Sequence, residues 1–381
     1  MTSYPPPRPA PWQTGAPSAR LGGGTPVPRP GGPTTAAPLT HSEFYRTPRN
    51  RWWKGLISIL AVSAAILLIS VVVSFGAVAI ELLRGTMSTE EIASGQIAMT
   101  PVLLLATNLA LIASAAVAVV LHRYLHRQPV GTLHAVEGRF RWGWLGRAAV
   151  VVVPLFVGYA AVVALLEAPG PLVLDATAWA FLAIVLLTTP LQAAAEEYMF
   201  RGVIQRAAGS WVSGAIPSLL LGTLVSAAAF SIAHFASDGW LIAYYFVFGV
   251  AMSLLTHFTG GLEAASLVHA ANNVVLFLVS TLTGQMGEAV DRSAGVGGPF
   301  MLAPMLVIAA VAAVLILLGR RRGLQNGSRA APPEEPNHVL LEEYVSGNAG
   351  DQANGIAGFS GRQDTRFLWP LPRLPSPMRE T

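Results

Sequence analysis

The sequence predicts an all-α, polytopic membrane protein with about eight transmembrane helices. Of its 381 residues, 53% are hydrophobic and only 12% are charged. Soluble domains carry roughly a quarter of charged residues. The mean hydropathy is +0.53, and apolar runs long enough to cross a bilayer as helices recur through the middle of the chain. A lipid bilayer is therefore the expected environment of this chain.

The eight predicted spans each hold about 20 or more residues, which is the length a helix needs to cross the hydrocarbon. The fourth is expected to continue beyond the membrane surface as far as Ala208. The spans are placed near residues 55–83, 97–121, 145–166, 176–197, 214–235, 240–258, 262–283 and 299–319.

The basic residues predict the orientation of these spans, because cytoplasmic loops are enriched in Lys and Arg. They lie just before the first span, in the second and fourth loops and just after the last span. The intervening loops carry only Arg84 and Arg292. The sequence therefore predicts a multi-pass protein of the cell membrane with both termini in the cytoplasm. The basic residues behind this prediction are Arg46, Arg49, Arg51, Lys54, Arg123, Arg127, Arg139, Arg141, Arg147, Arg201, Arg206 and Arg320 to Arg322.

Three regions follow along the chain. Residues 1–50 are rich in Pro and Gly and predict a disordered cytoplasmic tail, since they hold too little apolar surface to bury. Residues 51–322 form the eight-helix membrane domain. Residues 323–381 are again polar and predict a mostly disordered cytoplasmic tail.

Composition also excludes several function classes. The chain has no cysteine, which excludes a thiol nucleophile, a disulfide framework and a thiolate metal site. The sequence pI is near 9.7, but the basic residues follow the membrane topology and no nucleic-acid-binding motif is present. We therefore expect no nucleic-acid partner. The oligomeric state is not indicated by the sequence.

The first unusual polar group lies inside the fourth apolar run. Glu196, Glu197 and Arg201 occur in the segment QAAAEEYMFRGVI. Charged residues inside membrane helices are costly and mark functional sites by default. Glu197 and Arg201 are four residues apart, on one helix face, and can form an ion pair. Glu196 points elsewhere, has no expected partner on its own helix, and is the candidate general base.

Two further groups carry polar side chains at the same four-residue spacing. Phe230 and His234 close the fifth span, where His234 adds an imidazole and Phe230 is expected to shape a pocket. His269 and Asn273 lie on one face of the seventh span. An imidazole and an amide pointing the same way can stabilise an oxyanion. Alternatively, they can form hydrogen bonds with a neighbouring helix.

Together these motifs resemble a known family. EEYMFRG, then FSIAH, then TGGLEAASLVHAANN is similar to the CPBP family of CAAX proteases and bacteriocin-processing enzymes, also called the Abi family. The resemblance covers residues 176–283, and the order and spacing of all three motifs agree with the family.

The resemblance implies a glutamate-dependent membrane endopeptidase without a cofactor, whose site opens to the cytoplasm. Glu196 would activate water with help from His234, and His269 with Asn273 would form the oxyanion hole. Glu197 and Arg201 would support the site, together with Phe230. The implied substrate is a membrane protein or peptide cut near its membrane-embedded end. Its identity, and whether a lipid group on it is read, stay open.

Two alternatives remain at this level. Glu196, His234 and His269 could bind zinc as a catalytic site does, with one carboxylate and two imidazoles, although the usual H-E-x-x-H spacing is absent. The polar cluster could instead belong to a non-catalytic membrane scaffold or immunity-type binding protein. One geometric difficulty also arises, because alternating spans place Glu196 and His234 at opposite membrane surfaces.

Overall fold

The computed structural model describes residues 38–328 apart from 49, 96, 168–171 and 287–290, and this part is almost entirely helical. It contains eight helices that are long and apolar enough to cross a membrane, as the sequence predicted. These spans are Trp52–Arg84, Pro101–Leu125, Trp142–Val163, Ala176–Gly209, Ala215–Ala233, Gly239–Thr259, Glu263–Leu282 and Pro299–Arg321.

Some spans are built from more than one element, and short elements join them. The elements, in chain order, are β1 (Leu39–Thr40), η1 (His41–Glu43), α1 (Trp52–Arg84), α2 (Thr89–Ser94), α3 (Pro101–Val120), η2 (Leu121–Leu125), α4 (Gly131–His134), α5 (Trp142–Glu167), α6 (Ala176–Glu197), η3 (Tyr198–Ile204), α7 (Gln205–Gly209), α8 (Ala215–Ala233), α9 (Gly239–Thr259), α10 (Glu263–Leu282), η4 (Pro299–Met301), α12 (Leu302–Arg321) and β2 (Gly327–Ser328).

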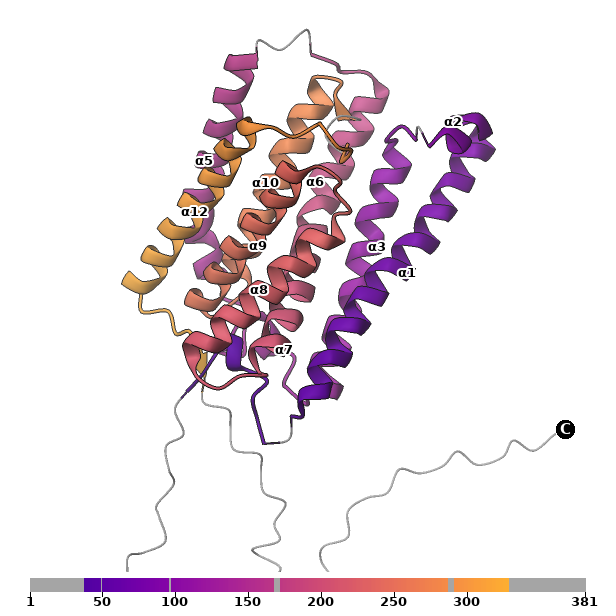
Figure 1. The fold of residues 1–381 in the computed structure, drawn as a ribbon. Coiled ribbons are helices and arrows are strands. Elements are labelled where there is room, and N and C mark those ends of the chain that lie inside the picture. Colours follow the sequence, from indigo (N-terminus) through magenta and orange to yellow (C-terminus); the bar gives the residue numbers. More distant parts are fainter. Residues whose placement is uncertain (1–37, 49, 96, 168–171, 287–290, 329–381) are drawn as a thin grey trace, which may run out of the picture. The chain divides into compact units, whose positions relative to one another are not determined.

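The helices pack in a defined order around α6. Helix α1 packs mainly on α3, and α3 packs on α6 (Figure 1). Helix α10 lies between α6 and α5, while α8 pairs with α9 and α9 with α12. Large apolar side chains remain exposed on the outer helix faces, as in Val72, Val150 and Leu187. These faces suit hydrocarbon, because lipid takes the place of a protein partner there.

Local sequence signals fix where the helices start and stop. Asp175 accepts a hydrogen bond from the Ala178 amide at 2.7 Å and caps α6. Thr100 caps α3 in the same way, with Pro101 in the first turn. Gly260 ends α9 with φ of +70°, a left-handed conformation that glycine adopts at helix C-termini. The chain then turns directly into α10.

The fourth span is unusually long, and this resolves the difficulty with Glu196 and His234. It runs from Ala176 to Gly209, 34 residues, with η3 forming a π-helical segment in its second half. Glu196 lies thirteen residues before Gly209, which is about 20 Å along the helix axis. Its side chain is therefore well inside the span, away from the end that leads into α8.

Helix α8 runs back along this span in the opposite direction. The Ser226 hydroxyl donates to the Phe200 carbonyl at 3.0 Å, and the rings of Phe200 and Phe230 meet edge to face at 5.2 Å. Glu196 lies one turn before Phe200 on the fourth span. His234 lies one turn after Phe230, at the end of α8. Antiparallel packing thus brings these two side chains to the same level.

The segment before α1 corrects the predicted boundary of the N-terminal tail. Residues 39–43 form β1 and η1, a turn follows at Phe44 and Tyr45, and His41, Ser42 and Tyr45 are fully buried against the helices. The Tyr45 hydroxyl bonds to His122 Nδ1 at 2.8 Å, and the Ser42 hydroxyl to His257 Nδ1 at 2.9 Å. The disorder predicted for residues 1–50 is thus wrong for this segment, because its side chains fill a polar gap between helices.

The other predictions for the tails fall largely outside the described residues, which exclude 1–37 and 329–381. At the C-terminal side, residues 327 and 328 form β2, which pairs antiparallel with β1. The described N- and C-terminal segments therefore lie next to each other.

Hydrogen bonds to backbone carbonyls join the inter-helix connections into two groups. The Leu262 amide donates to the His134 carbonyl at 2.8 Å, and the Trp211 indole donates to the Trp52 carbonyl. We call this group the terminal end; it comprises β1, η1, β2 and residues 126–141, 210–214 and 260–262. At the other end, the Val173 amide donates to the Leu282 carbonyl, and the Ser237 amide to the Arg292 carbonyl. We call this the far end; it comprises the described residues of 85–100, 172–175, 234–238 and 283–298.

Candidate active site

A fully buried ion pair lies at the centre of the bundle. Arg201 Nη1 donates to Glu197 Oε1 at 3.0 Å, and neither side chain is exposed. His269 Nδ1 lies 2.7 Å from the same Glu197 oxygen, although 72 residues separate them in sequence. Because a carboxylate oxygen only accepts, Nδ1 of His269 carries the hydrogen. Glu197 thereby joins α6 to α10 and fixes the orientation of the imidazole ring.

Glu196 has one anchored and one unengaged carboxylate oxygen. Its Oε1 accepts a 2.5 Å hydrogen bond from the Gln192 amide, one turn earlier on α6. Its Oε2 is buried without a hydrogen-bond partner and lies 3.6 Å from His269 Nε2. Buried polar atoms are rarely left without a partner, and such exceptions occur at catalytic sites. This oxygen is therefore available to a water molecule or a proton.

Phe230 forms the aromatic centre of the site. Its ring lies 4.5 Å from the Arg201 guanidinium carbon, a cation–π contact in a water-poor setting. The same ring meets the rings of His234, Phe248 and His269 at centroid distances of 4.5, 5.5 and 5.7 Å. Phe230 is 1% exposed, so it holds three polar groups in place without competing for their hydrogen bonds.

His234 occupies the C-terminal cap of α8. Its Nδ1 lies 2.8 Å from the Phe230 carbonyl oxygen, and its ring stacks on Tyr245 at 3.8 Å. Since a carbonyl can only accept, Nδ1 is the protonated nitrogen. In the neutral ring, Nε2 is then a hydrogen-bond acceptor. The structure thus presents one imidazole nitrogen able to accept a proton or a water hydrogen.

Asn273 belongs to a short polar chain on α10. The Tyr244 hydroxyl donates to Asn272 Oδ1, and Asn272 Nδ2 donates to Asn273 Oδ1, each at 3.1 Å. The Asn273 side-chain oxygen thus accepts a hydrogen bond from Asn272. The Asn273 amide nitrogen can then donate a hydrogen bond to a bound group. Asn272 therefore orients its neighbour.

A cavity of about 670 Å³ connects these groups. Gln192, Glu196, His234 and Asn273 all line it, together with Phe200 at its inner limit. The rest of the lining is mostly apolar and comes largely from α1 and α3. His269 does not line the cavity and lies against Glu196 instead. The arrangement therefore places a carboxylate, an imidazole and two amides on the wall of a space large enough for part of a peptide.

The structure brings all seven predicted site residues into one region. Glu196, Glu197 and Arg201 come from the fourth span, Phe230 and His234 from α8, and His269 and Asn273 from α10. One expectation was wrong: Glu196 does have a partner on its own helix, which is Gln192. The four-residue spacing from Gln192 to Glu196 was visible in the sequence, but only the rotamers show that the two side chains meet.

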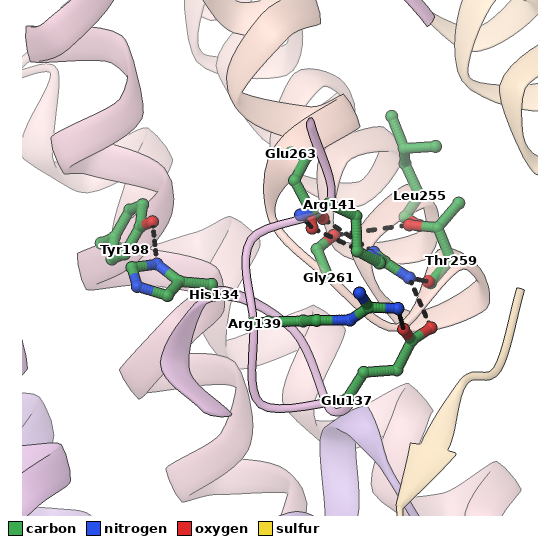
Figure 2. Close-up of polar contacts among 9 residues, drawn as sticks. All are labelled: His134, Glu137, Arg139, Arg141, Tyr198, Leu255, Thr259, Gly261 and Glu263. Atoms are coloured by element: carbon green, nitrogen blue, oxygen red, sulfur yellow. Dashed lines mark hydrogen bonds and ion pairs between the residues drawn. The ribbon is translucent and has the colours of Figure 1, made fainter. Parts of the chain in front are cut away.

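A second buried ion pair fixes the start of α10 (Figure 2). Arg141 donates to both oxygens of Glu263, at 2.8 and 2.7 Å, and its Nη1 donates to the Thr259 carbonyl. A bidentate Arg–carboxylate pair is geometrically specific. Close by, the Tyr198 hydroxyl and His134 Nδ1 are hydrogen-bonded. The connection 126–141 is thus tied both to α10, which carries His269, and to η3, which follows Glu197.

If Glu196 acts as the general base that the sequence predicts, removing the Gln192 donor is expected to slow hydrolysis and leave substrate binding nearly unchanged. A hydrogen bond to a charged group is worth about 1.5–3 kcal/mol, so Gln192→Leu should lower kcat by roughly 10- to 100-fold. The variant Gln285→Leu, at an exposed far-end position, is the matched control. Steady-state kinetics on a cleaved substrate would check this. A change in KM alone would contradict a role in positioning Glu196.

Comparison with known proteins finds one family model that covers this region. Residues 177–275 match the family model described as type II CAAX prenyl endopeptidase Rce1-like. The chain is also 34% identical over 106 residues to the uncharacterized protein YyaK of Bacillus subtilis (strain 168). That alignment covers 26% of this chain and 34% of YyaK, so the chain matches about a third of the length of this curated relative. No solved structure matches the chain.

The matched segment contains each of the seven residues described above, from Glu196 to Asn273. It also contains Gln192, the hydrogen-bond donor to Glu196. Residues 177–275 of this chain are therefore similar to the Rce1-like CAAX prenyl endopeptidases, consistent with the CPBP family that its three motifs predicted.

Proposed function

We propose that this protein is a membrane endopeptidase that hydrolyses a peptide bond near the membrane-embedded end of a protein or peptide substrate. Glu196 activates the attacking water. The observation that carries this proposal is the buried Oε2 of Glu196, which has no hydrogen-bond partner, beside an imidazole and on the wall of a cavity. The Rce1-like match supports the coarser statement, a CAAX-type membrane protease.

The chain's own residues supply each step of hydrolysis. Glu196 takes a proton from water as the water oxygen attacks the carbonyl carbon, and Nε2 of His234 accepts the second water hydrogen as a hydrogen bond. The Asn273 amide donates to the oxyanion that forms. When the C–N bond breaks, the proton held by Glu196 passes to the leaving amine. The products are an amine and a carboxylic acid, and the acid then releases its proton to become a carboxylate.

His269 has a different position from the one its motif implied. The resemblance assigned it to the oxyanion hole with Asn273, whereas its Nε2 faces Glu196 and its Nδ1 is bonded to Glu197. We propose that His269 shares the proton with Glu196. The proton would move between Glu196 Oε2 and His269 Nε2, which lie 3.6 Å apart.

The zinc alternative requires Glu196, His234 and His269 to converge on one point. In the part of the chain that the structure describes, no three His, Asp or Glu side chains are grouped to hold a metal ion. We therefore propose a mechanism without a resident metal. Incubation with a strong chelator is expected to leave the hydrolysis rate unchanged, measured on the purified protein with and without added zinc. Loss of activity that zinc restores would contradict the proposal.

The direct test is a comparison of cells that carry the wild-type protein or Glu196→Gln. Quantitative profiling of membrane-protein C-termini should reveal species that stay uncut only in the variant, which would establish proteolysis and identify the substrate. A non-catalytic scaffold tolerates this isosteric change. Identical profiles from a folded, normally abundant variant would therefore favour the scaffold.

A further inference from the structure

The catalytic cavity extends from Glu196 toward one end of the bundle only. On α1 its lining begins at Ile66, fourteen residues after the helix starts, and continues to Val78. On α10 it comprises Asn273 and Phe277, in the half of the helix nearer the far end. The innermost lining residue of the fourth span is Phe200.

Far-end connections complete the lining. Ile92, Ile97 and Met99, from the connection between α1 and α3, lie on the cavity wall, as does Arg292 from the connection after α10. His234 and Phe235 contribute from the connection after α8. None of the terminal-end residues defined above contributes to the lining. The site therefore communicates with the far end of the bundle and not with the end where the described terminal segments lie.

The two ends also differ in charge. Among the described residues, the terminal end and the helix turns that adjoin it hold most of the basic side chains, including Arg127, Arg139 and Arg141. At the far end the described basic residues are Arg84 and Arg292. Acidic residues outnumber them there, namely Glu81, Glu90, Glu91, Asp175, Asp238 and Asp291. Because Lys and Arg are retained on the cytoplasmic side, the far end is the non-cytoplasmic one.

Taken with the proposed function, on which this inference rests, we infer that the catalytic cavity opens to the non-cytoplasmic side of the membrane. Its substrates are membrane-anchored proteins or peptides whose scissile bond lies in the non-cytoplasmic half of an apolar segment. The apolar side chains of α1, such as Leu67 and Phe75, would pack against this segment. This inference differs from the cytoplasmic opening that the family resemblance implies.

Because the chain has no cysteine, single introduced cysteines can report the opening directly. Ser74→Cys places a thiol on the cavity wall. Ser94→Cys marks the far end, at the exposed end of α2, and Ser213→Cys marks the terminal end, at an exposed position between α7 and α8. Val72→Cys is the matched control: it lies near the level of Ser74, is 71% exposed on the outer face of α1, and does not line the cavity.

The probe is a small, charged, membrane-impermeant thiol reagent, applied to intact and to permeabilised cells. In intact cells we expect labelling of Ser94→Cys and Ser74→Cys, and no labelling of Ser213→Cys. Permeabilisation should add Ser213→Cys. We expect no labelling of Val72→Cys under either condition, because the reactive thiolate forms in water and not in hydrocarbon.

Three outcomes would overturn the inference. They are labelling of Ser74→Cys only after permeabilisation, its absence under both conditions, and labelling of Ser213→Cys in intact cells. None of these labelling measurements depends on catalysis. They can contradict the inferred cavity opening while the proposed proteolysis holds, and the proteolysis can fail while the inferred opening holds. The cut sites found by C-terminal profiling give a second check, since cuts at the cytoplasmic end of substrate spans would also contradict the inference.

Discussion

Glu196→Gln is expected to reduce the rate of peptide hydrolysis by about 10²- to 10⁴-fold, the usual contribution of a general base. The substitution keeps the side-chain shape and an oxygen that can accept from Gln192. It removes the negative charge that draws a proton from water. Because the substrate-facing cavity is unchanged, KM should change little. Initial rates on a substrate identified by C-terminal profiling would measure both parameters.

The matched control for this variant is Glu90→Gln, a carboxylate on the exposed surface of α2. It makes the same chemical change outside the cavity and should retain the wild-type rate. Thermal unfolding in detergent should give similar midpoints for both variants, which separates catalysis from folding. Near-normal hydrolysis by a folded Glu196→Gln protein would remove Glu196 from the mechanism.

Arg201→Leu is expected to destabilise the fold by about 3–5 kcal/mol, because it leaves the buried Glu197 carboxylate without its cation. Both side chains are fully buried, so water cannot solvate the remaining charge. The guanidinium also donates to the Gly249 carbonyl at 3.3 Å and covers the Phe230 ring. Its loss therefore affects α6, α8 and α9 together. Denaturant unfolding of the purified protein would measure the change.

The double variant Glu197→Gln with Arg201→Leu distinguishes charge from packing. Removing both partners eliminates the uncompensated charge, so part of the stability should return, and the two effects should not add. Arg139→Leu is the control: Arg139 is 79% exposed and only 3.8 Å from Glu137, and an exposed pair contributes about 1 kcal/mol or less. Equal destabilisation by Arg139→Leu and Arg201→Leu would contradict the importance of burial.

The sequence determined those features that depend on a single helix. Span length and hydropathy specified eight crossing helices, since each must satisfy its own backbone hydrogen bonds in lipid. The four-residue spacing of Glu197 and Arg201 specified their ion pair, because side chains one turn apart lie on one helix face. For the same reason, the polar positions His269 and Asn273 were recognisable as candidates before their surroundings were known.

Only the tertiary structure decided how the spans meet. The bond from His269 to Glu197 joins α10 to α6, and the burial of residues 39–45 requires the ends of several helices at once. The cavity depends on the packing of α1 on α3 and of α3 on α6, and its direction follows from which connections lie at the far end. Most of the surface in these helix–helix contacts is apolar and chemically alike, so the local sequence pattern does not specify which helix each one packs against. Helix packing supplies the missing information, because close-packed side chains fit in only a few arrangements.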